Sequence, residues 1–128
     1  MAVSSYPPLA QNGQVLLENG AIRPIKVFSA NPAASGNNAF IAAVASRKIR
    51  ILGYRIQNRG AAVVTVTFND TTAAAITGTP TLTLEAREGV VATAEPHGFE
   101  FESPSGTGVQ VNLSATVTTF VGVHYVEV

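Results

Sequence analysis

Residues 47–70, RKIRILGYRIQNRGAAVVTVTFND, organise the predicted fold. Its second half alternates, with apolar side chains at Val64, Val66 and Phe68 and mostly polar ones at the positions between them. A period of two residues is typical of a half-buried β-strand, and it places Phe68 in the core. The first half carries apolar side chains at both odd and even positions, which predicts a strand covered on both faces.

The two halves are separated by Asn58, Arg59 and Gly60. Asn and Gly tolerate positive φ at low cost, so these residues favour a tight turn. We therefore predict that residues 47–70 form a β-hairpin.

The rest of the chain repeats the same pattern of short apolar or alternating runs between turn residues. The clearest runs are residues 25–30, 81–85, 90–93, 109–114 and 117–128. β-Branched residues (Val, Ile and Thr) make up 36 of the 128 residues, and no helical pattern of credible length is present. These features predict an all-β fold, an antiparallel, jelly-roll-like β-sandwich of about eight or nine short strands.

The N-terminal residues differ from the rest in having more turn residues than apolar ones. Pro7-Pro8, Asn12-Gly13 and Asn19-Gly20 surround a single short apolar run, Val15-Leu16-Leu17. We therefore predict an extended N-terminal arm over residues 1–21 and one β-sandwich domain over residues 22–128. The apolar run of the arm could also pair as an edge strand or bind a neighbouring subunit. The first residues lack the basic and apolar regions of a secretory leader, which favours synthesis in a cytoplasm.

Composition limits the possible partners. The formal net charge is zero and charged residues make up 12%, about half of the share in ordinary soluble domains. No basic footprint for nucleic acid is present, and no apolar run approaches the ~20 residues of a membrane-spanning helix. Because 46% of residues are apolar and few charges oppose association, we expect self-assembly, as a homotrimer.

Catalytic and metal-binding groups are scarce. A Ser-His-Asp arrangement would need the single aspartate, Asp70, with His97 or His124, and no nucleophile-elbow motif accompanies them. Cysteine is absent, which excludes disulfides and thiolate metal sites. We predict neither an enzyme nor a cofactor.

One group has metal-like residue types, Glu95, His97, Glu100 and Glu102. Hard cations need denser oxygen ligation than this spacing offers, so we interpret the group as a solvated face and predict no metal site.

The charged residues segregate along the chain. Five of the eight basic residues lie within residues 47–59, and five of the eight acids lie within residues 85–102. They either pair across strands of one sheet or form a two-signed surface that mates between copies or with a partner. The sequence leaves both alternatives open.

Four segments resemble small β-sandwich virion proteins of tailed bacteriophages over about residues 26–128. The segments are residues 43–52 (AVASRKIRIL), 64–68 (VTVTF), 106–114 (GTGVQVNLS) and 122–128 (GVHYVEV). The resemblance implies a capsid decoration or cement protein, of which many are trimers seated between capsomers, or a module of a tail or fibre protein.

The resemblance and the composition together lead us to expect a cement protein on the capsid exterior of a virion. Its partners would be the major capsid protein and further copies of itself, with no nucleic acid and no membrane. The alternative is a tail- or fibre-associated module that contacts a host surface glycan. The candidate contact residues are Tyr6, Pro7, Pro8, Val15, Leu16, Leu17, Arg47, Lys48 and Arg59.

Overall fold

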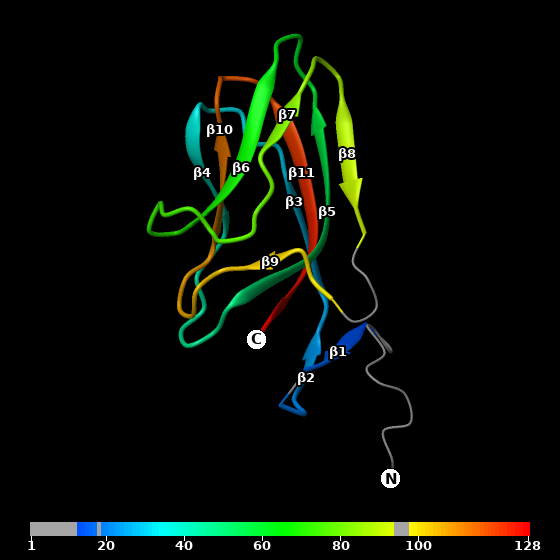
Figure 1. Ribbon diagram of the computed structural model, residues 1–128, viewed down its shortest axis with the longest axis vertical. Helices are drawn as coiled ribbons and strands as arrows, with labels where there is room; N and C mark the ends of the chain where they lie inside the picture. The colour runs from blue at the N-terminus through cyan, green and yellow to red at the C-terminus, as the bar shows by residue number, and fades with distance from the viewer. Residues whose placement is uncertain (1–12, 18, 94–97) are drawn as a thin grey trace.

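The computed structural model describes residues 13–17, 19–93 and 98–128, and these form eleven β-strands and no helix (Figure 1). The strands are β1 (Gln14–Leu16), β2 (Ile22–Pro24), β3 (Lys26–Ala30), β4 (Gly36–Ile41), β5 (Ile49–Asn58), β6 (Val64–Asp70), β7 (Leu82–Leu84), β8 (Gly89–Ala92), β9 (Phe101–Glu102), β10 (Val109–Leu113) and β11 (Thr119–Glu127).

Two antiparallel sheets pack face to face. One has the order β4-β10-β6-β7 and the other the order β3-β11-β5-β8, with β9 also pairing with β5. The pairing is nested, because β3 pairs with β11, β4 with β10, β5 with β8 and β6 with β7. This is the winding of an eight-stranded jelly roll, which confirms the predicted fold class.

The predicted hairpin over residues 47–70 is wrong. Its two halves are strands, but β5 pairs with β11, β8 and β9, whereas β6 pairs with β10 and β7 in the other sheet. The chain crosses from one sheet to the other between them, so β5 and β6 meet through their core-facing side chains and not through backbone hydrogen bonds.

The crossing is held by the side chain of Asn58, which is fully buried. Its Nδ2 donates to the carbonyls of Ala62 (2.7 Å) and Leu84 (3.2 Å), and its Oδ1 accepts from the N–H of Gly60 (2.8 Å). These bonds satisfy a buried amide and tie the crossing to β7.

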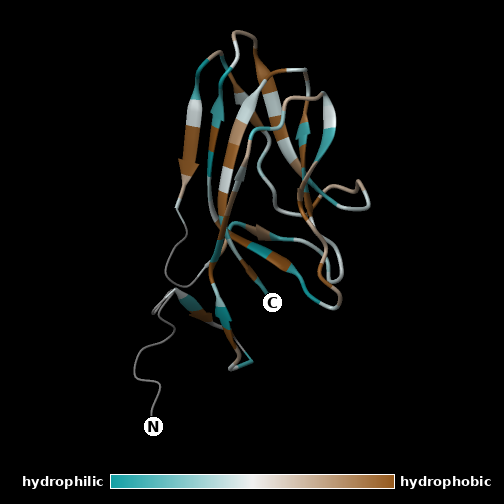
Figure 2. Ribbon diagram, turned by 180° about the vertical axis from the view of Figure 1, so that it is seen from behind, coloured by the Kyte–Doolittle hydropathy of each residue, from teal (hydrophilic) through white to brown (hydrophobic). Residues whose placement is uncertain are grey.

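The core lies between the sheets and centres on Phe68, which is fully buried as predicted. Its ring centroid lies 4.9 Å from that of Phe101 and 6.2 Å from that of Tyr54, so three strands contribute aromatic rings to one cluster. Figure 2 shows hydrophobic residues in bands along the strands of both sheets.

A β-bulge at Leu52 changes the phase of β5. Gly53 pairs with His124 and Ile51 pairs with Tyr125, so Leu52 is an extra residue in the ladder between β5 and β11. Apolar residues on either side of Leu52 therefore face the same core although their positions differ in parity. The bulge therefore explains why β5 carries apolar side chains at both odd and even positions.

The side chain of Leu52 is covered by a small hairpin, β1 with β2, at the lower end of the molecule in Figure 1. Val15 and Leu17 are buried and form a second apolar cluster with Leu52 and Val126. A division of the chain between residues 21 and 22 would cut this hairpin. The predicted arm therefore includes residues that pack on the sandwich.

Candidate interaction surface

The two outer faces of the sandwich differ in chemistry. On the β4-β10-β6-β7 sheet, polar side chains bond to one another across the strands: Asn37 Oδ1 accepts from Nδ2 of Asn69 (2.7 Å) and of Asn112 (2.9 Å), and the hydroxyls of Thr65 and Thr83 lie 3.0 Å apart. This face is polar, and most of the polar side chains named here bond to one another across the strands.

The outer face of the β3-β11-β5-β8 sheet is largely apolar and hollowed. The register places Ser29, Gly122, Arg55 and Val91 opposite one another across its four strands. Val27 is 69% exposed and Val91 is 63% exposed, although both are large apolar residues in strands. The hollow in this face, which we call the groove, has a volume of about 570 Å³.

Two glycines explain why this face is hollow. Gly53 and Gly122 both line the groove and present no side chain there. A Cβ atom on Gly122 would lie 3.1 Å from the Phe120 ring, so the missing side chain lets that ring lie against the strand. The groove is thus encoded by glycines in strands that otherwise carry β-branched residues.

Arginines lie at one side of the groove. The guanidinium carbon of Arg55 lies 5.9 Å from the centroid of the Phe120 ring, and that of Arg59 lies 5.2 Å from it. Neither arginine forms an ion pair with an acid in the described part of the chain. None of the described residues that line the groove is Asp or Glu.

A second, more polar hollow of about 390 Å³ adjoins Arg59 and is lined also by Gln57, Asn58 and Arg87. Arg87 has a positive φ of 66° in the turn before β8. In that turn the carboxylate of Glu88 accepts from the N–H of Glu85 (2.9 Å).

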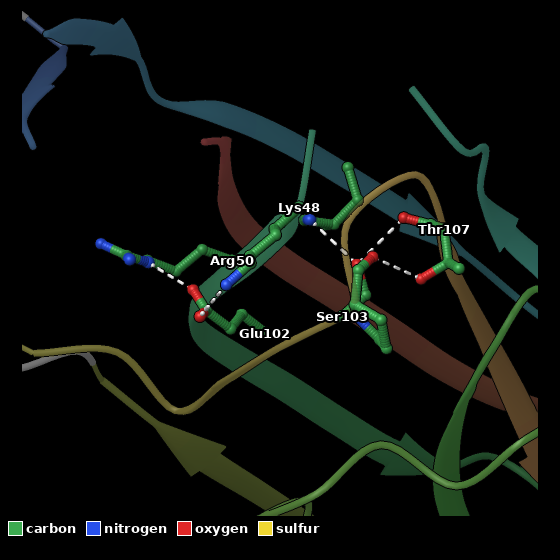
Figure 3. Close-up of polar contacts among 7 residues, drawn as sticks. Lys48, Arg50, Glu102, Ser103 and Thr107 are labelled. Atoms are coloured by element: carbon green, nitrogen blue, oxygen red, sulfur yellow. Dashed lines mark hydrogen bonds and ion pairs between the residues drawn. The ribbon is translucent and has the colours of Figure 1, made fainter. Parts of the chain in front are cut away.

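At the other end of β5 the charges are paired (Figure 3). Arg50 lies opposite Glu102 in the β5·β9 pairing, and its Nε donates to that carboxylate at 2.9 Å. Lys48 Nζ lies 3.4 Å from the same carboxylate. Here the segregated charges of the sequence pair across strands of one sheet.

Ser103 fixes the adjoining loop. Its Oγ accepts from the N–H of Ile49 (3.0 Å) and donates to the carbonyl of Thr107 (3.0 Å). These groups hold β9 against the start of β5, so the polar contacts in Figure 3 are structural.

The predicted contact residues are divided between several places. Tyr6, Pro7 and Pro8, and the side chain of Leu16, lie outside the described residues. Val15 and Leu17 are buried within the chain, which leaves their side chains unavailable to a partner.

The three basic candidates separate along β5. Arg59 follows the end of this ten-residue strand and lies beside Phe120, whereas Arg47 and Lys48 precede its start. At 3.3 Å per residue, these two ends are about 30 Å apart. Only Arg59 adjoins the apolar face.

Sequence reasoning missed most of the surface. Val27, Val91, Phe120 and Gly122 come from three different strands and meet only through the register. The available signal was the glycine inside the otherwise β-branched run of β11, because a glycine in a strand marks a bulge or a close approach.

The two candidate catalytic residues that the structure describes, Asp70 and His124, do not meet. Asp70 ends β6 in one sheet, whereas His124 lies exposed in β11 of the other. The Asp70 carboxylate is a turn-forming group: it accepts from the hydroxyl and the N–H of Thr72 and from the N–H of Ala74. The hydroxyl of Thr72, followed by the two N–H groups, holds the pKa of Asp70 below its ordinary value of 3.8.

Glu95 and His97 lie outside the described residues. Within the part of the chain that the structure describes, no three His, Asp or Glu side chains come together as a metal site would require.

In the same described ranges, no helix has the length and apolarity to cross a membrane. No family model, curated protein or solved structure matches the chain. Fold and surface together describe an antiparallel jelly roll with one polar outer face and one apolar, arginine-bearing outer face.

Proposed function

We propose that this chain is a bacteriophage capsid decoration (cement) protein, which binds the exterior of the assembled head between capsomers and stabilises it. The observation that carries the proposal is the exposed apolar face of the β3-β11-β5-β8 sheet. Exposed apolar residues that share one hollowed face mark a site of interaction with another macromolecule. A rigid β-sandwich that presents such a face suits a structural binding protein.

The stabilisation follows from linkage. A protein that binds the intact lattice, and not its separated subunits, shifts the equilibrium toward the lattice by about 2.7 kcal/mol per site when its free concentration is 100 times Kd. Since a head offers many equivalent sites, modest affinity at each site has a large total effect.

In this proposal the protein is made in the host cytoplasm and ends on the capsid exterior of the virion. Its partners are the major capsid protein and two further copies of itself, with neither nucleic acid nor membrane. The low charge and the apolar surface support association, and closed cyclic symmetry limits it to a defined number of copies. Sedimentation at micromolar concentration should show a trimer, and a stable monomer would contradict this part of the proposal.

The groove also supports the alternative, a tail- or fibre-associated module that contacts a host glycan. Its volume lies within the ~300–1,000 Å³ of typical small-ligand sites. Sugars, however, need several hydrogen-bonding partners. Most of the described lining residues are apolar or glycine, and the main polar ones are Ser29, Arg55, Thr93 and His124. The cement function therefore fits the surface better.

Purified protein added to undecorated mature heads tests the proposal. Saturable binding to heads, without binding to host surface polysaccharide, is the expected result. Binding to polysaccharide and not to heads would replace the cement function with the tail or fibre function.

A further inference from the structure

We infer that the outer face of the β3-β11-β5-β8 sheet docks a protein surface that presents carboxylates beside apolar side chains. The inference rests on the proposed function only in taking the assembled head as that surface. It names the chemistry of the partner and the side of the groove at which the charged contact forms.

Two exposed valines form the apolar part of this surface. Val27 and Val91 lie mostly in solvent, on the edge strands β3 and β8, and the groove extends between them across β11 and β5. A partner side chain that enters the groove would bury these valines and displace water from apolar surface.

Two arginines form the charged part of this surface. Arg50 and Lys26, elsewhere on the same sheet, already have carboxylate partners at 2.9 Å, Glu102 and Glu127. Arg55 and Arg59 have none among the described residues, and the Phe120 ring lies between 5 and 6 Å from each guanidinium. A carboxylate brought to this ring would meet two arginines whose forked donors match its geometry.

The same features favour a protein over the other polyanions. Nucleic acid is bound through a row of phosphate contacts, whereas this face offers a mainly apolar hollow and two arginines that have no acidic partner among the described residues. An acidic polysaccharide would leave most of its hydroxyls without partners in such a hollow. A protein surface supplies both apolar side chains and a few carboxylates.

Charge reversal in the full-length protein tests the charged contact. The variant Arg55→Glu with Arg59→Glu is matched by Arg47→Glu with Lys48→Glu, which makes the same change in net charge at the other end of β5. Against undecorated heads, we expect the first pair to lower affinity at least about tenfold and to weaken the salt dependence of the association rate, and the second pair to change affinity by less than about threefold. Equal affinity of the first pair and the wild type would overturn the inference while the cement function stands.

A second measurement does not depend on heads. The full-length protein, labelled with ¹⁵N, is titrated with a short peptide in which two Glu residues flank Val-Pro-Leu, and with the same peptide carrying Lys in place of Glu. The acidic peptide should shift the amide signals of Arg55, Val91 and Gly122, and the basic peptide should not.

Shifts with neither peptide, or equal shifts with both, would overturn the inference. So would stronger binding of polygalacturonate or of a single-stranded oligonucleotide at the same charge concentration. Shifts with the acidic peptide in a protein that fails to bind heads would instead reject the proposed function and leave the surface assignment intact.

Discussion

The ring of Phe120 lies directly over the backbone of Gly122, where a Cβ atom would come within 3.1 Å of the ring carbon Cζ. The ring and a side chain at residue 122 therefore cannot both fit unless one of them shifts by a few tenths of an ångström. This relationship connects the local sequence of β11 with the shape of the apolar face.

Replacing Gly122 by Val should fill the groove and displace the Phe120 ring without unfolding the protein. A β-branched residue suits a strand, and the Phe120 side chain is only half-buried on the outer face, so the free energy of unfolding should change by less than about 1 kcal/mol. Binding to heads should fall at the same time. The matched control, Thr67→Val on the polar outer face, should leave binding unchanged, and equal binding by both variants would show that the groove is not used.

Replacing Phe68 by Ala should lower the free energy of unfolding by about 3–5 kcal/mol, because the substitution leaves a cavity beside Tyr54 and Phe101. Denaturant titration measures the loss. Phe99→Ala serves as the control, since Phe99 is 41% exposed and should cost less than about 1 kcal/mol. A loss at Phe68 as small as that at Phe99 would contradict the assigned core.

Replacing Leu17 by Ala should destabilise the free protein by about 2 kcal/mol, because Leu17 packs with Leu52 and Val126 beneath the β1·β2 hairpin. The melting temperature of the variant reports the loss. An unchanged melting temperature would contradict this packing and leave Leu17 as a candidate contact with a partner.

The contribution of Asp70 should depend on pH. Because its pKa is lower in the folded protein than its ordinary value of 3.8, the folded state gains stability from the ionised carboxylate above that pH and loses it as the pH falls through the folded pKa. Asp70→Asn cannot ionise, so the difference in melting temperature between wild type and variant should shrink as the pH falls below 3.8. A constant difference down to pH 2 would show that the turn does not depend on the charge.

The strands and the fold class could be predicted from the sequence because alternation and turn residues are local properties. The burial of Phe68 could be predicted for the same reason. The partner of each strand is not local: Asn58, Arg59 and Gly60 suit a tight turn, and the chain instead uses them to cross between sheets, where the buried amide of Asn58 bonds to β7.

Which side chains of β5 face the core could not be predicted either, because the bulge at Leu52 is defined only by the pairing of β5 with β11. The apolar outer face could not be predicted from the sequence. Val27, Val91 and Gly122 share a face through two successive registers, and nothing in the spacing of these residues along the chain indicates that they meet.

The temperature at which heads release their genome shows whether this protein stabilises them as a cement. Undecorated heads are heated alone, with saturating wild-type protein, and with the variant Val27→Asn with Val91→Asn, whose substitutions lie at exposed positions of the apolar face. A cement protein should raise the release temperature, and this double variant should raise it little or not at all. A release temperature that the wild-type protein leaves unchanged at saturation would contradict the cement function.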